Sequence, residues 1–255
     1  MSSRSASAGA ASDAAAAAVV AAGSGATPGA GDEGHGALAA AVQPGWLLAL
    51  HSSTDILGVA LQGPYLRGQE PPAPQLAAFP LGRALSNQLL ACVEELLPAP
   101  QWPQLGRLAV AIGPGGFTGT RLTVVLARTL AQQLGLPLDG VSSFQLIARR
   151  LLAAAAAPDD QPFWLVQELP RRGQVAGLYQ AEAAVPGGVA ELSAPRLYGA
   201  EHRFAGVSHP AVPLLPDDVA ELVAISRARE TAALQAPWAT VLPLYPTSPV
   251  QVEAC

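Results

Sequence analysis

Runs of apolar residues, separated by turn residues, divide the first ordered part of the chain into alternating strands and helices. Short apolar runs bounded by glycine or polar residues predict strands, and apolar residues repeating every three to four positions predict helices. We predict strands at residues 46–50, 56–61, 76–79, 108–112 and 138–141, and helices at 83–97, 122–134 and 144–157. The first two strands should form a hairpin around residues 51–55. Helices between the later strands favour parallel pairing in part of the sheet.

A second region begins after the break at residues 158–160. Strands are predicted at residues 163–167 and 174–180, followed by a strand- and loop-rich stretch at 181–216, a helix at 217–234 and an extended segment at 242–246. We therefore expect an N-terminal lobe at residues 46–157 and a smaller C-terminal lobe at 158–255. Residues 1–45 are rich in Ala, Gly and Ser and lack the large apolar residues that could offset ordering entropy. They are a disordered extension or the product of a start site placed too far upstream.

Composition narrows the class of protein. The chain has 255 residues, half of them apolar, and a net charge of −5. This acidic balance argues against a surface built to bind nucleic acid alone. Two cysteines, Cys92 and Cys255, give no disulfide framework, so a reducing cytoplasm is expected. No run is long and apolar enough to span a membrane.

A glycine-rich turn organises the N-terminal lobe. The sequence Gly-Pro-Gly-Gly-Phe-Thr-Gly-Thr-Arg at residues 113–121 follows a predicted strand and opens a predicted helix. Such a turn can bind a phosphate through free backbone N–H groups, or it can let two backbones approach closely. It lacks the lysine of a Walker A motif and the spacing of a Rossmann fingerprint. The tight turn is therefore favoured over a nucleotide site, and both uses involve Gly113, Gly115, Gly116, Thr118 and Gly119.

A second turn, at residues 51–55, is rich in hydroxyl groups. Ser52, Ser53 and Thr54 could form an anion-binding nest, or they could belong to an ordinary polar turn, which composition favours. The chain has no His-x-x-x-His or Cys-x-x-Cys spacing, so we predict no metal site. Cys92 falls in an apolar helical stripe and is expected to be an inert buried thiol.

The first two predicted helices carry wide apolar stripes. They are formed by Leu85, Leu89, Val93 and Leu96 on the first helix and by Leu122, Val125, Leu126, Leu130 and Leu134 on the second. A helix that is apolar over this much of its girth is buried on two sides. One side packs on its own sheet. The other side belongs to the internal core or to an interface with a partner, and the two wide stripes together favour the interface.

These motifs resemble the TsaB (YeaZ) family. The family pattern Gly-Pro-Gly-Ser-Phe-Thr-Gly-x-Arg, then a helix, a proline and Gly-Val-Ser-Ser, is similar to residues 113–121 followed by Gly-Val-Ser-Ser at 140–143. Weaker similarity covers Leu-Ala-Leu-His-Ser-Ser-Thr at residues 48–54, the first helix from Leu85, and Arg-Arg-Gly-Gln-Val at 171–175. A Leu-Tyr segment at residues 244–245 also matches the end of the family. The resemblance covers about residues 46–246.

The resemblance implies an α/β fold of the actin-like ATPase superfamily, with two ribonuclease-H-like lobes of mixed sheets flanked by helices. It implies a non-catalytic subunit that forms a heterodimer with TsaD through its first two helices. With TsaE, these proteins attach a threonylcarbamoyl group to adenosine 37 of tRNA. TsaD would carry the metal-binding histidines, so this chain would need no cofactor and would meet tRNA only through the complex. ATP would act at the level of the complex. Whether the free chain forms a homodimer stays open.

Two departures from the family pattern bear on the site. His51 stands where the family has an early aspartate, and Leu169-Pro170 stand where the second lobe has an acidic residue, with Glu168 one place off. The absence of an acidic residue at both positions suits a scaffold better than an enzyme. The alternative is a nucleotide-dependent kinase or phosphotransferase of the same superfamily that would place phosphates on both turns.

Overall fold

Five strands form the first of two sheets in the computed structural model, which describes residues 45–65 and 69–246. The strands are β1 (Trp46–His51), β2 (Ile56–Gln62), β3 (Gln75–Pro80), β4 (Leu105–Ala111) and β5 (Leu138–Val141), and their order in the sheet is β3-β2-β1-β4-β5. The strands predicted in this region and the hairpin of β1 and β2 are confirmed. β1, β4 and β5 pair in parallel, as the intervening helices predict. The predictions for residues 1–44 and for Cys255 lie outside the described residues.

Four α-helices accompany the sheets. They are α1 (Leu85–Leu96), α2 (Phe117–Leu134), α3 (Ser143–Ala153) and α4 (Asp217–Thr231), with short 3₁₀ turns at Gly82–Ala84, Ala99–Gln104 and Trp238–Thr240. The predicted second helix begins earlier than its apolar stripe, because Gly116 acts as its N-cap, and it ends as predicted at Gly135 with φ 67°. The helix predicted at 144–157 ends four residues early, at Ala153, and the helix predicted at 217–234 ends three residues early, at Thr231.

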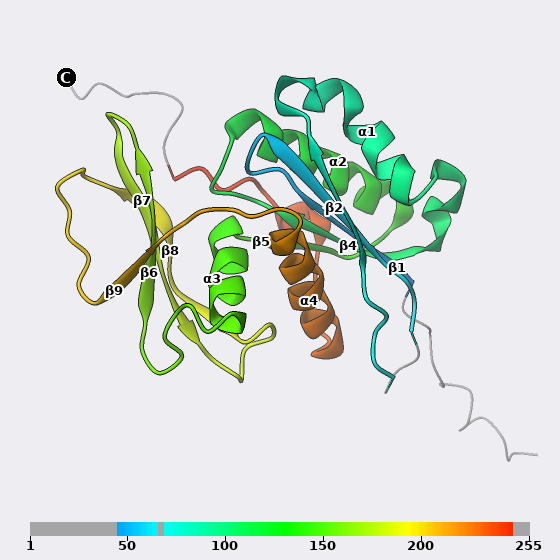
Figure 1. The fold of residues 1–255 in the computed structure, drawn as a ribbon. Coiled ribbons are helices and arrows are strands. Elements are labelled where there is room, and N and C mark those ends of the chain that lie inside the picture. The colour runs from blue at the N-terminus through cyan, green and yellow to red at the C-terminus, as the bar shows by residue number, and fades with distance from the viewer. Residues whose placement is uncertain (1–44, 66–68, 247–255) are drawn as a thin grey trace, which may run out of the picture. The chain divides into compact units, whose positions relative to one another are not determined.

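Helices cover both faces of the first sheet (Figure 1). Leu48 and Leu50 of β1 point to the side of α1 and α2, whereas Leu47 and Ala49 point to the side of α4. Successive side chains of a strand point to opposite faces. A sheet buried on both faces therefore needs a continuous apolar strand, which is what residues 47–50 supply.

Four strands form the second sheet. They are β6 (Phe163–Leu169), β7 (Gly173–Ala181), β8 (Val189–Tyr198) and β9 (Val207–Pro210), in the order β8-β7-β6-β9. β6 pairs antiparallel with β7 and parallel with β9, so this sheet is also mixed. Phe144 and Ile147 of α3 pack against Phe163 and Tyr179 of this sheet. Leu146, on the opposite side of α3, belongs to the core of the first sheet, so α3 is buried between two cores.

The last described segment closes the free edge of β5. The Leu138 N–H donates to the Ala236 carbonyl (2.9 Å), and the Leu244 N–H donates to the Ile112 carbonyl (2.7 Å). Between these bonds, Val241 packs into the core of the first sheet. Residues 236–244, which we call the edge strap, therefore satisfy one backbone group at the edge of β5, the Leu138 N–H, and one directly after β4, the Ile112 carbonyl.

Candidate functional site

The glycine-rich turn lies directly against the hydroxyl-rich turn. A Cβ atom on Gly115 would lie 2.3 Å from the Ser53 Cβ, and one on Gly119 would lie 2.7 Å from the Ser52 carbonyl oxygen. The Gly116 N–H donates to the Ser53 carbonyl at 2.7 Å. The glycines therefore serve close backbone approach, and the N–H of the α2 N-cap is satisfied by the protein itself.

The hydroxyl groups of the second turn are also engaged. Ser52 Oγ pairs with Thr123 Oγ1 of α2 at 2.8 Å, and Ser53 Oγ pairs with Ser143 Oγ at the start of α3. The Thr54 hydroxyl accepts a hydrogen bond from the Ile56 N–H at 3.1 Å. Both serines are buried. These groups join the turn to two helices and are not directed at an open binding site.

His51 lies at the end of β1, directly before this turn. Burial lowers the pKa of its imidazole to about 4, so the ring is neutral at pH 7. Its Nδ1 accepts a hydrogen bond from the Ser53 N–H (3.4 Å), which places the ring proton on Nε2. Within the described residues Nε2 has no partner. A neutral, fully buried imidazole in place of an aspartate cannot provide an acidic ligand for a metal-bound nucleotide.

A pocket of about 520 Å³ opens beside the glycine turn. Its lining includes Gly115 and Phe117 from the turn, Gln167 and Arg172 from β6 and the β6–β7 turn, and Tyr245 after the edge strap. The Phe117 and Tyr245 rings pack with centroids 5.0 Å apart. Arg172 is the charged residue of the lining. This pocket is where the alternative nucleotide hypothesis would have to place its ligand.

The predicted interface residues of α1 and α2 occupy three different environments. Leu85, Leu89, Val93 and Leu130 are buried in the core of the first sheet, and Leu96, Leu122, Leu126 and Leu134 are half-buried against it. Val125 is 54 % exposed. The side of α2 that faces the core carries Thr120, Thr123, Val124 and Ala127, so the helix is rotated relative to the stripe read from the sequence.

Exposed apolar side chains remain on both helices. Leu90 of α1 is 46 % exposed, as is Phe117 at the start of α2. We call Leu90 and Val125, with the half-buried Leu122 and Leu126, the two-helix surface. α1 and α2 pack against each other, so this surface belongs to one pair of adjacent helices.

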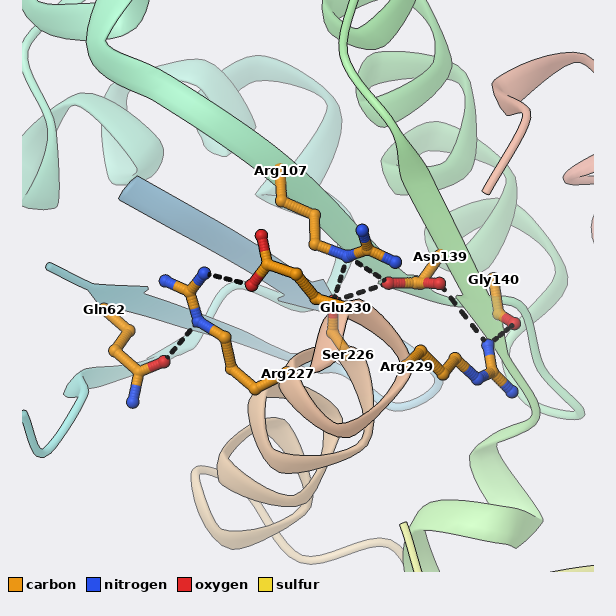
Figure 2. Close-up of polar contacts among 8 residues, drawn as sticks. All are labelled: Gln62, Arg107, Asp139, Gly140, Ser226, Arg227, Arg229 and Glu230. Carbon is orange, nitrogen blue, oxygen red and sulfur yellow. Dashed lines mark hydrogen bonds and ion pairs between the residues drawn. The ribbon is translucent and has the colours of Figure 1, made fainter. Parts of the chain in front are cut away.

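Sequence reasoning missed a buried polar cluster that joins α4 to the first sheet (Figure 2). Arg107 Nε of β4 and Asp139 Oδ2 of β5 lie 2.7 Å apart, and Ser226 Oγ of α4 donates to the same oxygen at 2.6 Å. Arg229 Nη1 donates to the Gly140 carbonyl at 3.2 Å. The sequence signal for this cluster was a charged residue inside each of two apolar strands, Arg107 in β4 and Asp139 in β5. The contacts indicate a structural role, because they join β4, β5 and α4, although Arg107 Nη2 is buried without a partner among the described residues.

Arg227 makes a second set of contacts at the same end of the sheet (Figure 2). Its Nε donates to Gln62 Oε1 at 2.7 Å, and its Nη1 pairs with Glu230 Oε2 at 2.7 Å. The bond to Gln62 holds α4 over β2, and the pair with Glu230 lies within α4. Together with the Arg107 cluster, the bond to Gln62 fixes the helix at several points.

In residues 45–65 and 69–246, no group of three His, Cys, Asp or Glu side chains is placed to hold a metal ion. Over the same residues, no helix is both long and apolar enough to cross a membrane.

Comparisons with known proteins agree with this architecture. A family model described as "TsaD: tRNA N6-adenosine threonylcarbamoyltransferase" matches residues 74–194. The tRNA threonylcarbamoyladenosine biosynthesis protein TsaB of Bacillus subtilis (strain 168) is 37 % identical over 139 residues, or 52 % of this chain. That match spans 55 % of the curated relative, about half of its length.

Solved structures are similar over a longer stretch. A Pseudomonas aeruginosa protein described as similar to peptidase YEAZ has a TM-score of 0.60 and 21 % identity, over 80 % of this chain and 100 % of its own. The structure of YeaZ from the same organism has a TM-score of 0.60 and 20 % identity, over 79 % and 99 %.

Two mixed sheets flanked by helices form an α/β fold of the actin-like type, as expected, and the YeaZ structures have the same fold. The glycine turn and the matched relatives are more specific than this fold. They support the TsaB (YeaZ) family that the sequence resembles.

Proposed function

We propose that this chain is a non-catalytic subunit in the threonylcarbamoylation of tRNA adenosine 37, acting as the dimerisation and activating partner of TsaD. TsaE would complete the assembly, in the cytoplasm. The proposal rests on the similarity to TsaB proteins and on one structural observation: α1 and α2 keep apolar side chains, above all Leu90 and Val125, exposed to solvent. Exposed apolar groups on adjacent elements are typical of protein interfaces.

The close packing of the glycine turn against the hydroxyl turn supports a scaffold role for this chain. An actin-like enzyme needs space and free donors for phosphates. Here Gly115 lies against Ser53, and the Ser52 and Ser53 hydroxyls contact α2 and α3. The glycine turn thereby fixes the start of α2, the helix that carries Val125. This connects the family motif to the surface that would meet TsaD.

The test is binding of the full chain to TsaD. We expect co-purification of the two proteins, and Val125→Glu or Leu90→Glu should weaken binding by roughly 30-fold or more, because a charge would be buried at the interface. Leu192→Glu is the matched control, since Leu192 is 50 % exposed on β8 of the other sheet. Wild-type affinity in both helix variants would contradict the proposal. So would threonylcarbamoyl transfer by this chain without TsaD.

The kinase or phosphotransferase alternative has its own test. It requires tight ATP–magnesium binding by the isolated chain in the pocket beside the glycine turn. Arg172→Ala removes the charged residue of that lining and keeps the turn intact, whereas a Gly115 variant would disrupt the fold. Calorimetry that finds ATP binding in the wild type and its loss in Arg172→Ala would favour the alternative.

A further inference from the structure

Aromatic rings gather on the face of the second sheet that points away from α3. Phe163 and Leu165 of β6 point into the core beneath α3, so Trp164 between them points outward. The Trp164 ring lies 4.8 Å from the Phe204 ring and 6.0 Å from the Tyr198 ring, between centroids. We call Trp164, Tyr198, His202 and Phe204 the aromatic face.

The loop after β8 is fixed on this face by hydrogen bonds. Gln174 Nε2 donates to the Ala200 carbonyl at 2.7 Å, and Trp164 Nε1 donates to the Ala205 carbonyl at 3.1 Å. The loop carries His202, whose ring is exposed and lies 4.7 Å from both the Tyr198 and Phe204 rings. A hollow of about 760 Å³ beside it is lined by His202, Arg203, Phe204 and the acidic Glu168 among others. The rings are therefore held in place beside an open concavity.

Two arginines, Arg196 and Arg203, adjoin this face. The Arg196 guanidinium lies 5.0 Å from the Tyr198 ring centroid, and its Nε donates to the Tyr198 hydroxyl at 2.7 Å. Arg203 lines the hollow. Arg171 and Arg172 are exposed on the β6–β7 turn, directly before the Gly173–Gln174 segment that contacts the loop.

Like Arg83, Arg121 and Arg128 on the 3₁₀ turn before α1 and on α2, these arginines have no ion-pair partner among the described residues. Every ion pair found among the described residues involves arginines of β4, α3 or α4, namely Arg107, Arg149, Arg150, Arg227 and Arg229. In the same part of the chain, no carboxylate lies within 4 Å of the guanidinium groups of Arg171, Arg172, Arg196 or Arg203. In an acidic chain of net charge −5, Arg196 and Arg203 thus lie beside one exposed ring, that of His202, and the half-buried rings of Tyr198 and Phe204, with no carboxylate in ion-pair contact among the described residues.

We propose that the aromatic face binds single-stranded RNA, with bases stacking at His202, Tyr198 and Phe204 and phosphates contacting Arg196 and Arg203. Rings and guanidinium planes that stack unpaired bases, beside cations for the backbone, are the chemistry of single-stranded RNA recognition. An acidic peptide would need the cations but not the rings. The inference rests on the proposed function only for the choice of RNA over DNA, and it adds a direct RNA contact to a chain otherwise expected to meet tRNA through its partner.

The test uses the full chain and a fluorescent twelve-nucleotide single-stranded RNA of mixed sequence. Anisotropy should rise on titration at low salt. The salt slope is the slope of the logarithm of the binding constant against the logarithm of the salt concentration. Each phosphate contact to a single strand contributes about −0.7 to it, so two contacts predict a slope near −1.4. Arg196→Gln or Arg203→Gln should each reduce the slope by about 0.7.

Stacking is tested separately from charge. His202→Ala should weaken RNA binding about fivefold or more, at an unchanged salt slope, because it removes an exposed ring and leaves every arginine in place. Tyr198→Phe keeps the ring and should bind like the wild type. Arg83→Gln is the matched charge control, since Arg83 is exposed on the 3₁₀ turn before α1. A thermal melt of each variant separates lost binding from lost folding.

Three outcomes would overturn the proposal: no RNA binding by the wild type, no effect of His202→Ala in a folded protein, or an effect of Arg83→Gln equal to that of Arg196→Gln. Loss of RNA binding on arginine substitution alone would show that charge without base stacking carries the binding, and it would overturn the proposed stacking site. The assay contains no TsaD, and TsaD binding is measured without RNA. Failure of this inference is therefore distinguishable from failure of the proposed function.

Discussion

The backbone of Gly115 lies so close to Ser53 that a Cβ atom there would sit 2.3 Å from the Ser53 Cβ. That contact joins the two turns at the ends of the neighbouring parallel strands β1 and β4. It explains the glycine by shape: the position has no room for any side chain. The glycine turn and the hydroxyl turn are in effect one packed unit.

Gly115→Ala should therefore lower the free energy of unfolding by about 3 kcal/mol, because an added methyl group must displace backbone atoms. Gly116→Ala is the control. A Cβ at Gly116 would lie 3.6 Å from the Ser53 carbonyl oxygen, an ordinary contact, and its φ of −56° suits any residue. Urea denaturation of both variants measures the difference. Equal stabilities would show that the turns do not need this close approach.

Val125→Glu should leave the stability of the isolated chain within about 0.5 kcal/mol of the wild type, because Val125 is half-exposed. Leu130→Glu, one turn further along α2, should destabilise it by several kcal/mol, since Leu130 is buried and the carboxylate would lose its hydration. Urea midpoints compare the two. A large loss in Val125→Glu would mean that this position supports the fold, and its use as an interface probe would then fail.

The stability of the protein should decrease as the pH is lowered, because the buried His51 resists protonation in the folded state. Its folded pKa of about 4 lies below the unfolded value of 6.5, so the unfolded state binds more protons between these values. The contribution is fully present above pH 6.5 and is lost as the pH falls toward 4, by about 3 kcal/mol in total. Denaturant titrations between pH 4 and 8 measure this trend.

His51→Asn isolates the effect, because Asn does not titrate. Burial raises the pKa values of Asp218, Glu191 and Glu221, and raised carboxyl pKa values act in the opposite direction, favouring the folded state at lower pH. The difference between wild type and His51→Asn cancels these shared terms. A difference that stays constant between pH 4 and 7 would contradict the assigned protonation of His51.

Asp139→Leu should cost roughly 3–5 kcal/mol of stability, because it leaves the buried Arg107 guanidinium without its partner. The double variant Arg107→Met/Asp139→Leu should recover much of that loss, since a well-packed apolar pair can replace a buried ion pair. Glu230→Gln, at the more exposed Arg227 pair, should have a small effect. Additive losses in the double variant would show that the two groups are not coupled.

Sequence reasoning found the strands and helices because their signals are local. The continuous apolar run at residues 47–50 predicts a strand buried on both faces, and the structure covers both faces. The end of α3 was not predictable in this way. Residues 154–157 are good helix formers, but Ala155 takes a φ of 51°, and Ala157 turns back into the core beneath α3. Tertiary packing overrides helix propensity there.

The site was harder to predict than the fold. Thr123 looks polar and therefore exposed, yet its hydroxyl meets Ser52 from a turn 71 positions away in the sequence. Periodicity assigned Val125 to an apolar stripe, and the rotation of α2 toward Thr123 instead leaves Val125 in solvent. Pairings between distant polar residues carry no local signal. For the same reason, the Arg107–Asp139 contact could be noticed only as an oddity in two apolar strands.

The order of elements along the chain has a consequence for synthesis on the ribosome. All five strands of the first sheet have been made by Val141, but α4 and the edge strap, which cover its face and its edge, end only at Thr231 and near Leu244. At ordinary rates of translation, the sheet waits roughly 5–20 s for them. During that interval the nascent chain exposes apolar strands and an unpaired edge. Chaperones that shield such surfaces should matter more to this protein than its small size implies.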